Sequence, residues 1–275
     1  MTSKFWKGLL YIVAGFVFFA SIVANYIDNW FLQLWVHFTL QYIILFLVLL
    51  IIALRYYTRS FLTLIIAIGL LINLSKIIPF YLSKPSLSIN YKEKLTIMSI
   101  NLWSQNKSMA SVKQLLKEQD SDIIIFLEYT GEWHNQLKTE LSKYPYHKMR
   151  IRSDNFGMAV YSKIAMETKL QINVVPQINA KIKSDEPFFL LVRHPRPPLN
   201  SETYQAQKEM FNKIGDFVNN TAKPVLVAGD LNSSSFSYSF EELINTTSLV
   251  DTRDGFGVQA TWPSSFGNFG ITLDH

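Results

Sequence analysis

A carboxylate and a carboxamide stand two positions apart in the stretch PVLVAGDLNSSS, where Asp230 and Asn232 follow an apolar run. A carboxylate in this setting can deprotonate a water molecule, and a carboxamide can hold the reacting groups by hydrogen bonds. The same two residues can instead close an Asx-turn. The sequence therefore leaves two interpretations of the pair, a site that holds a reacting phosphate or a turn cap.

Other polar side chains stand where apolar runs end. Asn101 closes LTIMSIN, Glu128 follows IIIFL, and His194 follows FFLLVR. Loops at strand ends bring distant side chains together in α/β sheets, so this order predicts one shared site. Taken singly, Asn101 can be a turn residue and His194 a loop histidine, and Asp251 in SLVDT can cap a helix or a loop.

Strands and helices must position these side chains. Runs of apolar and β-branched residues predict strands at Leu95–Asn101, Ile123–Leu127, Gly157–Tyr161, Phe188–Val192 and Val225–Ala228. Helical spacing of apolar residues predicts helices from Ser108 to about Glu118 and over Asn200–Asn219. Strands that alternate with helices indicate an α/β domain.

Three apolar stretches precede this domain, at Gly8–Tyr26, Phe31–Leu54 and Phe61–Ile78. Each would be roughly 27–36 Å long as a helix, which matches a hydrocarbon core of about 30 Å. The first could be a cleaved signal peptide, but two further stretches follow it. The sequence predicts a three-helix membrane anchor over residues 1–80, a linker over 81–93 and a globular domain over 94–275.

Charges in the short loops predict the orientation of the anchor. The N-terminal tail carries Lys4 and Lys7, the second loop carries Arg55 and Arg59, and the loop around Asp28 has no Lys or Arg. The positive-inside rule then places the N-terminus in the cytoplasm. Three spans would export the globular domain from a multi-pass membrane protein.

Charge and cysteine content exclude several function classes. The net charge is +5, but the part from Ile89 onward carries 20 Lys and Arg against 20 Asp and Glu. A neutral domain argues against tight binding of duplex DNA, which rests on Lys and Arg contacts to phosphates. The chain has no cysteine, so a disulfide, a thiolate metal site and a cysteine nucleophile are all excluded.

The ordered motifs resemble the endonuclease/exonuclease/phosphatase superfamily, the metal-dependent phosphoesterases typified by pancreatic deoxyribonuclease. The resemblance covers roughly Leu95 to His275 and rests on SINLW, DIIIFLEYT, FGMAVYSK, LVRHPRPP, VLVAGDLN, LVDT, TWPS and ITLDH. It implies a four-layer α/β sandwich of the DNase I-like type and hydrolysis of a phosphodiester, in nucleic acid or in a lipid or lipid-linked compound, with Mg²⁺ or Mn²⁺. Similar chains with hydrophobic N-terminal helices are bacterial, which implies the inner (plasma) membrane and an extracytoplasmic catalytic domain.

The resemblance also implies residue roles. Glu128 and Asn101 would hold the metal ion, and Asn101, His194 and Asn232 would contact the substrate. His194 and Asn232 would also take part in catalysis, together with Asp230, which would activate water, and Asp251, which would orient the family's last histidine.

One motif of the family is missing from the chain as given. The family's final SDH strand lies beyond an LDH-type motif, and here the chain stops at His275 within ITLDH. We therefore expect a truncated C-terminus or a defective copy. The alternative function is a non-catalytic membrane protein that uses a degenerate phosphoesterase domain as a binding module. A transporter is disfavoured because the apolar stretches hold no paired charges, and nothing in the sequence indicates a protein partner.

Overall fold

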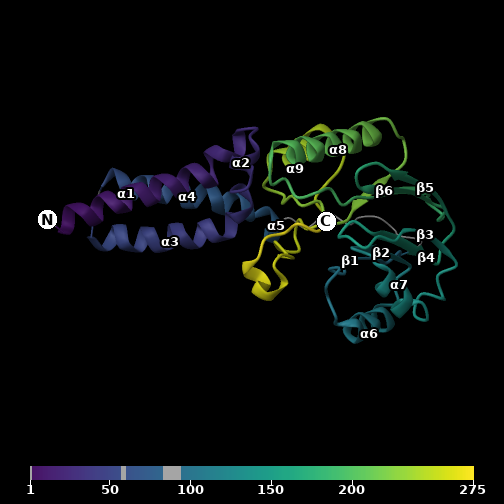
Figure 1. Cartoon of the computed structure of the whole chain (residues 1–275). Helices are drawn as coiled ribbons and strands as arrows, with labels where there is room; N and C mark the ends of the chain where they lie inside the picture. The colour runs from purple at the N-terminus through teal and green to yellow at the C-terminus, as the bar shows by residue number, and fades with distance from the viewer. Residues whose placement is uncertain (1, 57–59, 83–93) are drawn as a thin grey trace. The chain divides into compact units, whose positions relative to one another are not determined.

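The computed structural model describes residues 2–56, 60–82 and 94–275, which form two compact units (Figure 1). The sheet unit consists of Ser88–Arg196, Lys213–Asn232 and Asp274–His275. The helical unit consists of Met1–Leu87, Pro197–Asn212 and Ser233–Leu273. Each unit is thus built from separate stretches of chain. The predicted linker lies outside the described residues from position 83 onward, and the domain limits at 80 and 94 stay a prediction.

Two four-stranded sheets form the sheet unit. The first has the order β1-β2-β4-β3, with strands Ile97–Asn101, Ile123–Leu127, Met158–Ser162 and Tyr146–Arg150. The second has the order β5-β6-β7-β8, with strands Met166–Ile172, Pro176–Ile182, Phe188–Val192 and Val225–Ala228. β1 runs parallel to β2 and β7 parallel to β8, so the carboxyl ends of these pairs lie at one edge of each sheet.

Successive side chains of β2 point to opposite faces of the first sheet, and this alternation explains why the two sheets stack. Ile123, Ile125 and Leu127 belong to a buried cluster that includes side chains of the second sheet, while Ile124 and Phe126 belong to a cluster on the other face. That second cluster includes residues of α6 (Met109–Gln119) and α7 (Gly131–Leu137). A strand buried on both faces is apolar throughout, as IIIFL is.

A helix covers the outer face of the second sheet. α8 (Ser201–Asn219) places Phe217 against Phe189 of β7, with ring centroids 5.0 Å apart. The layers therefore follow the order helix, sheet, sheet, helix (Figure 1).

The N-terminal part of the helical unit is a bundle of three apolar helices, α1 (Thr2–Ser21), α3 (Thr39–Tyr56) and α4 (Phe61–Ile77). Short helical turns connect them: η1 (Val23–Tyr26), α2 (Trp30–Gln33) and η2 (Val36–Phe38), while α5 (Pro79–Leu82) follows α4. Two helical segments, Phe5–Tyr26, which includes η1, and Trp30–Tyr56, which includes α2 and η2, are long and apolar enough to cross a membrane. The third predicted span is a shorter apolar helix of 17 residues.

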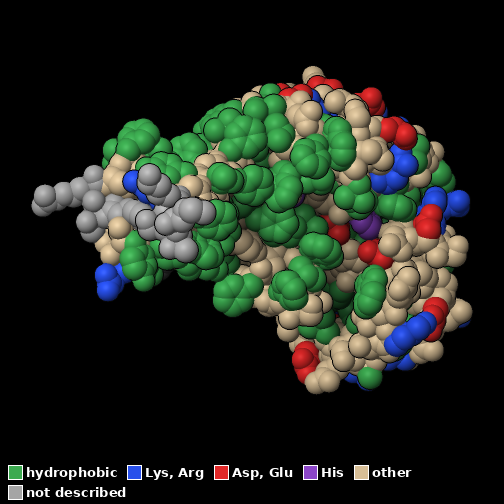
Figure 2. Space-filling view, turned by 60° about the vertical axis from the view of Figure 1, so that its left-hand side comes forward, with side chains coloured by type: hydrophobic (Ala, Val, Ile, Leu, Met, Phe, Trp, Pro, Cys, Tyr) green, Lys and Arg blue, Asp and Glu red, His purple; other side chains and the backbone are tan. Residues whose placement is uncertain are grey.

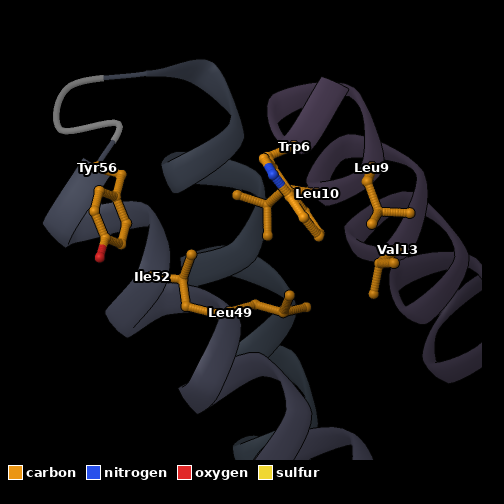
Figure 3. A pocket seen from close by; sticks show the side chains of 7 residues that line it. All are labelled: Trp6, Leu9, Leu10, Val13, Leu49, Ile52 and Tyr56. Carbon is orange, nitrogen blue, oxygen red and sulfur yellow. The ribbon is translucent and has the colours of Figure 1, made fainter. Parts of the chain in front are cut away.

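The helices are apolar on their outer faces as well as in their core. Phe46 and Ile66 are fully buried between helices, whereas Ile12 is 70%, Ile51 67% and Leu71 64% exposed. An apolar hollow of about 440 Å³ opens between α1 and α3, with Trp6 and Tyr56 among its lining residues (Figure 3). Its lining is apolar apart from the Trp6 indole N–H and the Tyr56 hydroxyl.

The chain after Asn232 packs into the helical unit. Phe236 joins the helical core and stacks edge-to-face on Phe80. Asn25 Nδ2 donates to the Phe236 carbonyl (3.2 Å), and Ser234 Oγ lies 2.8 Å from Nδ1 of His37. These contacts join residues about two hundred positions apart, so the helices are built into the fold of the later chain.

Candidate functional site

Side chains from both sheets meet where four strands end. Asn101 is the last residue of β1, Glu128 follows β2, His194 lies two residues after β7, and Asp230 lies two residues after β8. Asn101 Nδ2 donates to Oδ2 of Asp230 at 3.0 Å, so a hydrogen bond joins an end of the first sheet to an end of the second.

The Asp230 carboxylate serves the turn and the site together. Its Oδ1 accepts from the backbone N–H of Asn232 (2.8 Å), which is an Asx-turn, and its Oδ2 faces Asn101 and His194. Asn232 has a φ of +49° and donates through Nδ2 to the Pro195 carbonyl (2.9 Å). The turn-cap interpretation of the Asp230–Asn232 pair is therefore confirmed. The phosphate-site interpretation stays a prediction, and it is compatible with the turn because Oδ2 lies outside it.

Gly229 lets the ends of β7 and β8 approach. Its φ is +133°, and a Cβ at this position would lie 2.1 Å from the Arg193 carbonyl oxygen. Only glycine fits such a close approach of two backbones at this φ. The contact sets Asp230 beside His194, with Nε2 of the histidine 3.9 Å from Oδ2 of the aspartate.

Glu128 is buried, 7% exposed, and its Oε2 accepts from the Ser104 backbone N–H at 2.9 Å. Its φ of +56° is in the left-handed region, where a residue with a side chain carries backbone strain. Strained backbone of this kind gathers at functional sites. Gly157 supports the next turn, because a Cβ there would lie 2.1 Å from the Tyr129 carbonyl oxygen.

Burial and like charge shape the electrostatics of the cluster. Burial and the negative charge of Glu128 raise the pKa of Asp230 to about 6, although hydrogen bonds from Asn232 and Asn101 act in the opposite direction. Burial lowers the pKa of His194, against the charges of Glu128 and Asp274. The cluster thus combines two repelling acids with a neutral imidazole at neutral pH.

Asp274 belongs to this cluster although the sequence did not single it out as a site residue. The backbone N–H groups of Gly229 and His275 donate to each other's carbonyls (2.9 and 2.8 Å), and Asp274 forms a bridge with Asp230. The available signal was the ITLDH motif itself, but its pairing with the end of β8 cannot be read from one sequence.

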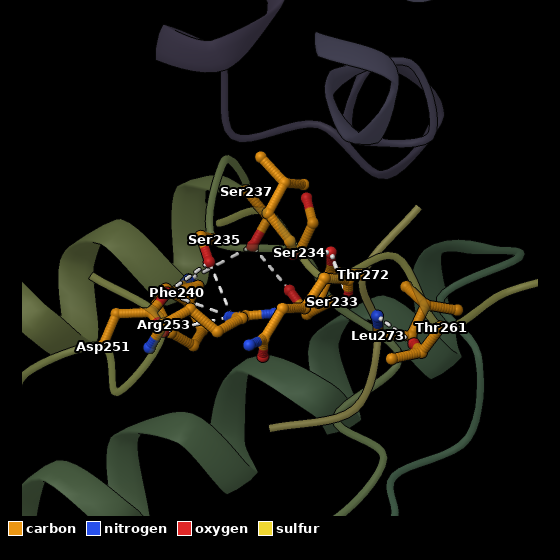
Figure 4. A network of polar contacts seen from close by, with 12 residues as sticks. Ser233, Ser234, Ser235, Ser237, Phe240, Asp251, Arg253, Thr261, Thr272 and Leu273 are labelled. Atoms are coloured by element: carbon orange, nitrogen blue, oxygen red, sulfur yellow. Dashed lines mark hydrogen bonds and ion pairs between the residues drawn. The ribbon is translucent and has the colours of Figure 1, made fainter. Parts of the chain in front are cut away.

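Asp251 lies in the helical unit and is bonded elsewhere. Arg253 donates to both of its oxygens at 3.0 Å, and the Ser235 hydroxyl donates to Oδ2 (Figure 4). Burial would raise the pKa of Asp251, but the hydrogen bonds and charge of Arg253 hold it below its ordinary value. Asp251 thus forms a buried ion pair with Arg253 in the segment after α9 (Tyr238–Thr246), and Ser235 joins this pair to the loop after Asn232.

The donor set at the cluster suits a hard cation bound partly by non-protein oxygens. In the described part of the chain, no group of three or more His, Asp or Glu side chains is arranged to hold a metal ion. Glu128 and Asp230 are nevertheless two buried carboxylates, and the negative charge of Glu128 contributes to the raised pKa of Asp230. Mg²⁺ is commonly held by one or two carboxylates plus water and phosphate oxygens, and the buried carboxylate of Glu128 fits that pattern.

A comparison with protein families matches residues 98–275 to the Endonuclease/Exonuclease/phosphatase family. A search of curated protein sequences gives no match. The matched segment contains every member of the cluster and all of both sheets except Ile97, the first residue of β1.

Solved structures agree in fold. A β-hairpin deletion mutant of beta toxin from Staphylococcus aureus is similar with a TM-score of 0.50 and 15% identity, over 66% of this chain and 85% of that one. An AP endonuclease from Archaeoglobus fulgidus gives 0.47 and 14%, over 66% and 85%. A humanized D. rerio TDP2 gives 0.43 and 14%, over 50% of this chain and 62% of that one. At 15% identity the likeness to the beta toxin mutant concerns the fold alone, which is DNase I-like with two sheets.

Proposed function

Because the chain belongs to the Endonuclease/Exonuclease/phosphatase family of phosphoesterases, we propose that it is a membrane-anchored enzyme that hydrolyses a phosphodiester with a divalent metal ion and an activated water. The observation that carries the proposal is the hydrogen bond between Asn101 and Asp230. It gathers acids, amides and an imidazole from two sheets at one place, as the hydrolysis of a phosphate ester requires.

Glu128 and Asn101 are the residues that would hold the metal ion, Mg²⁺ or Mn²⁺. When bound, a hard divalent cation neutralises charge on the non-bridging oxygens of the phosphate. The buried carboxylate of Glu128 offers a hard oxygen ligand, and the backbone N–H of Ser104 fixes one of its oxygens at 2.9 Å. The Asn101 amide is fixed in turn, since its Oδ1 accepts from the Trp103 N–H at 3.0 Å.

Asp230 is the proposed general base. A water molecule attacks phosphorus, its proton passes to Asp230, and the ester bond to the leaving oxygen breaks. A raised pKa suits a base that must accept this proton near neutral pH. Asn101 and Asn232 orient the water and the phosphate by hydrogen bonds. His194 donates to the oxygen on which charge builds.

The catalytic role of Asp251 stays a prediction that is drawn from the resemblance to the family. With Arg253 and Ser235 as its partners, its proposed contribution is to hold the loop that follows Asn232.

Hydrolysis by the full-length protein tests the proposal. In detergent, the protein should cleave bis-p-nitrophenyl phosphate with Mg²⁺ or Mn²⁺, lose this activity in EDTA, and recover it when the metal ion is returned. Binding of phosphodiesters without any turnover in either metal ion would instead favour the non-catalytic binding module.

The proposed setting is the bacterial inner membrane, with three spans and an extracytoplasmic catalytic domain. The outward apolar side chains of α1, α3 and α4 support it, because a helix that is hydrophobic all round is buried in protein or in lipid. The α4 helix, with 17 residues, is at the short end of the lengths that span a bilayer. Lys and Arg in the tail and the second loop support the orientation.

Reporter fusions test the orientation. Alkaline phosphatase, which works only outside the cytoplasm, should be active when fused after Ser88, and a cytoplasm-dependent fluorescent reporter should be dark there. Fusion after Thr58 should give the reverse pattern and serves as the matched control. Activity in the opposite compartment at Ser88 would contradict the three-span count.

A further inference from the structure

The helical unit carries an exposed aromatic loop beside the start of α3. The loop runs from Trp262 to Gly270 and contains the short helix η3 (Ser264–Phe269). Its base is closed because the N–H groups of Trp262 and Ile271 each donate to the other residue's carbonyl, at 2.9 and 2.6 Å. Within this closed loop Phe266 is 63% and Phe269 65% exposed, and Trp262 at its base is 56% exposed.

The stretch of sequence that contains the loop has no charged residue. From Gly255 to Leu273 no residue is Lys, Arg, Asp or Glu. Phe256, also in this run, is 63% exposed. Large aromatic side chains gathered without charges are unusual on a surface that faces water, and they mark sites for other proteins or for membranes. Figure 2 shows hydrophobic side chains gathered over much of this face of the molecule.

The loop is tied to a defined level of the helix bundle. Gln41, in the first turn of α3, donates through Nε2 to the carbonyls of Phe269 (2.6 Å) and Gly270 (3.3 Å). α3 runs from Thr39 to Tyr56, and its 18 residues give a length of about 27 Å, close to the thickness of a hydrocarbon core. If α3 spans the bilayer, its start lies at one lipid–water interface, and so does the loop.

We propose that the aromatic loop, Trp262–Gly270, binds the lipid surface and inserts its aromatic side chains among the headgroups. The inference rests on the proposed spanning of the bilayer by α3. The headgroup level suits the loop on two counts. Aromatic rings favour the interface, and irregular backbone can keep its contacts with water there, which it cannot do in the hydrocarbon core.

The absence of cysteine from the chain allows a direct test by single-cysteine labelling. The full-length protein is reconstituted in phosphatidylcholine–phosphatidylglycerol nanodiscs, and a fluorophore is attached at Phe266→Cys. Two matched sites are labelled separately: Leu45→Cys on the outer face of α3, where Leu45 is 43% exposed, and Val174→Cys between β5 and β6 in the sheet unit, where Val174 is 69% exposed. Quenching is measured with spin labels on the lipid headgroup and deep in the acyl chain.

The expected result is an order of quenching. The label at position 266 should be quenched more by the headgroup spin label than by the deep spin label. The label at position 45 should be quenched more by the deep spin label. The label at position 174 should be quenched by neither. If the labels at 266 and 174 are both unquenched while the label at 45 is quenched, the loop does not bind lipid, but α3 still spans the bilayer. Blue-shifted but unquenched emission at 266 would mean that protein covers the loop, and would also overturn the proposal. No quenching at 45 would overturn the spanning of α3 together with the inference.

Discussion

Replacement of Glu128 by glutamine should abolish metal-dependent hydrolysis while leaving the fold intact. Glutamine keeps the size of the side chain and an oxygen that can accept the hydrogen bond from Ser104, so the turn after β2 is retained. The negative charge that would hold the cation is lost. Changes to residues that only support a metal ligand cost 10- to 100-fold, so loss of the ligand itself should lower kcat by about 10²-fold or more.

The measurement is hydrolysis of a model phosphodiester by the full-length protein over a range of Mg²⁺ concentrations. Glu132→Gln is the matched control, because Glu132 is an exposed glutamate whose partner is Lys107. The control should have the activity of the wild type. Activity of the Glu128 variant within a few-fold of wild type at saturating Mg²⁺ would contradict the metal assignment, and the thermal unfolding midpoint shows whether the variant is folded.

Replacement of Asp230 by asparagine should lower kcat by roughly 10²- to 10⁴-fold, the range over which general acid–base catalysis contributes. The amide oxygen can still accept from Asn232 and close the Asx-turn, so the geometry of the loop survives. What disappears is the group that takes the proton from water. KM should change little, because Asp230 is not proposed to bind the substrate.

Steady-state kinetics with Asp120→Asn as a control checks this prediction. Asp120 is an exposed aspartate that pairs with Lys143 and Lys163, and its variant should retain the wild-type kcat. If Asp230→Asn raised KM without changing kcat, the residue would bind substrate or metal, and another group would have to serve as the base.

The buried parts of the sheets could be predicted from sequence because their pattern is strong. β2, β7 and β8 lie where their apolar runs predicted them, and β1 and β4 differ from prediction by two residues at most. β3 and β5 were missed because they are half-exposed strands rich in polar residues, YHKMR and METKLQI. β6 was missed as well, because proline, glutamine, asparagine and lysine interrupt the apolar pattern of PQINAKI although the strand is mostly buried. A single weakly apolar strand has no local signal that separates it from a loop.

The sequence predicted the order in which polar side chains follow the strands, but it could not predict which of these side chains touch in the fold. The sequence placed polar side chains after four strands, but the bond between Asn101 and Asp230 depends on how two sheets stack. The bridge between Asp230 and Asp274 depends on pairing of a short segment that has no strand pattern of its own. Contacts of this kind are set by tertiary packing, so one sequence does not disclose them.

The interleaving of the helical unit has a consequence for biogenesis. The helices leave the ribosome before the later chain, yet Asn25 and Gln41 find their partners at Phe236 and Phe269, 211 and 228 positions further on. Until translation reaches those residues, the polar side chains at this end of the bundle lack their native partners, and Phe236 is missing from the core. Such a unit closes late, in the manner of a protein dominated by distant contacts. Separate expression of the later chain would leave Phe236 and its neighbours without the surface they fold against.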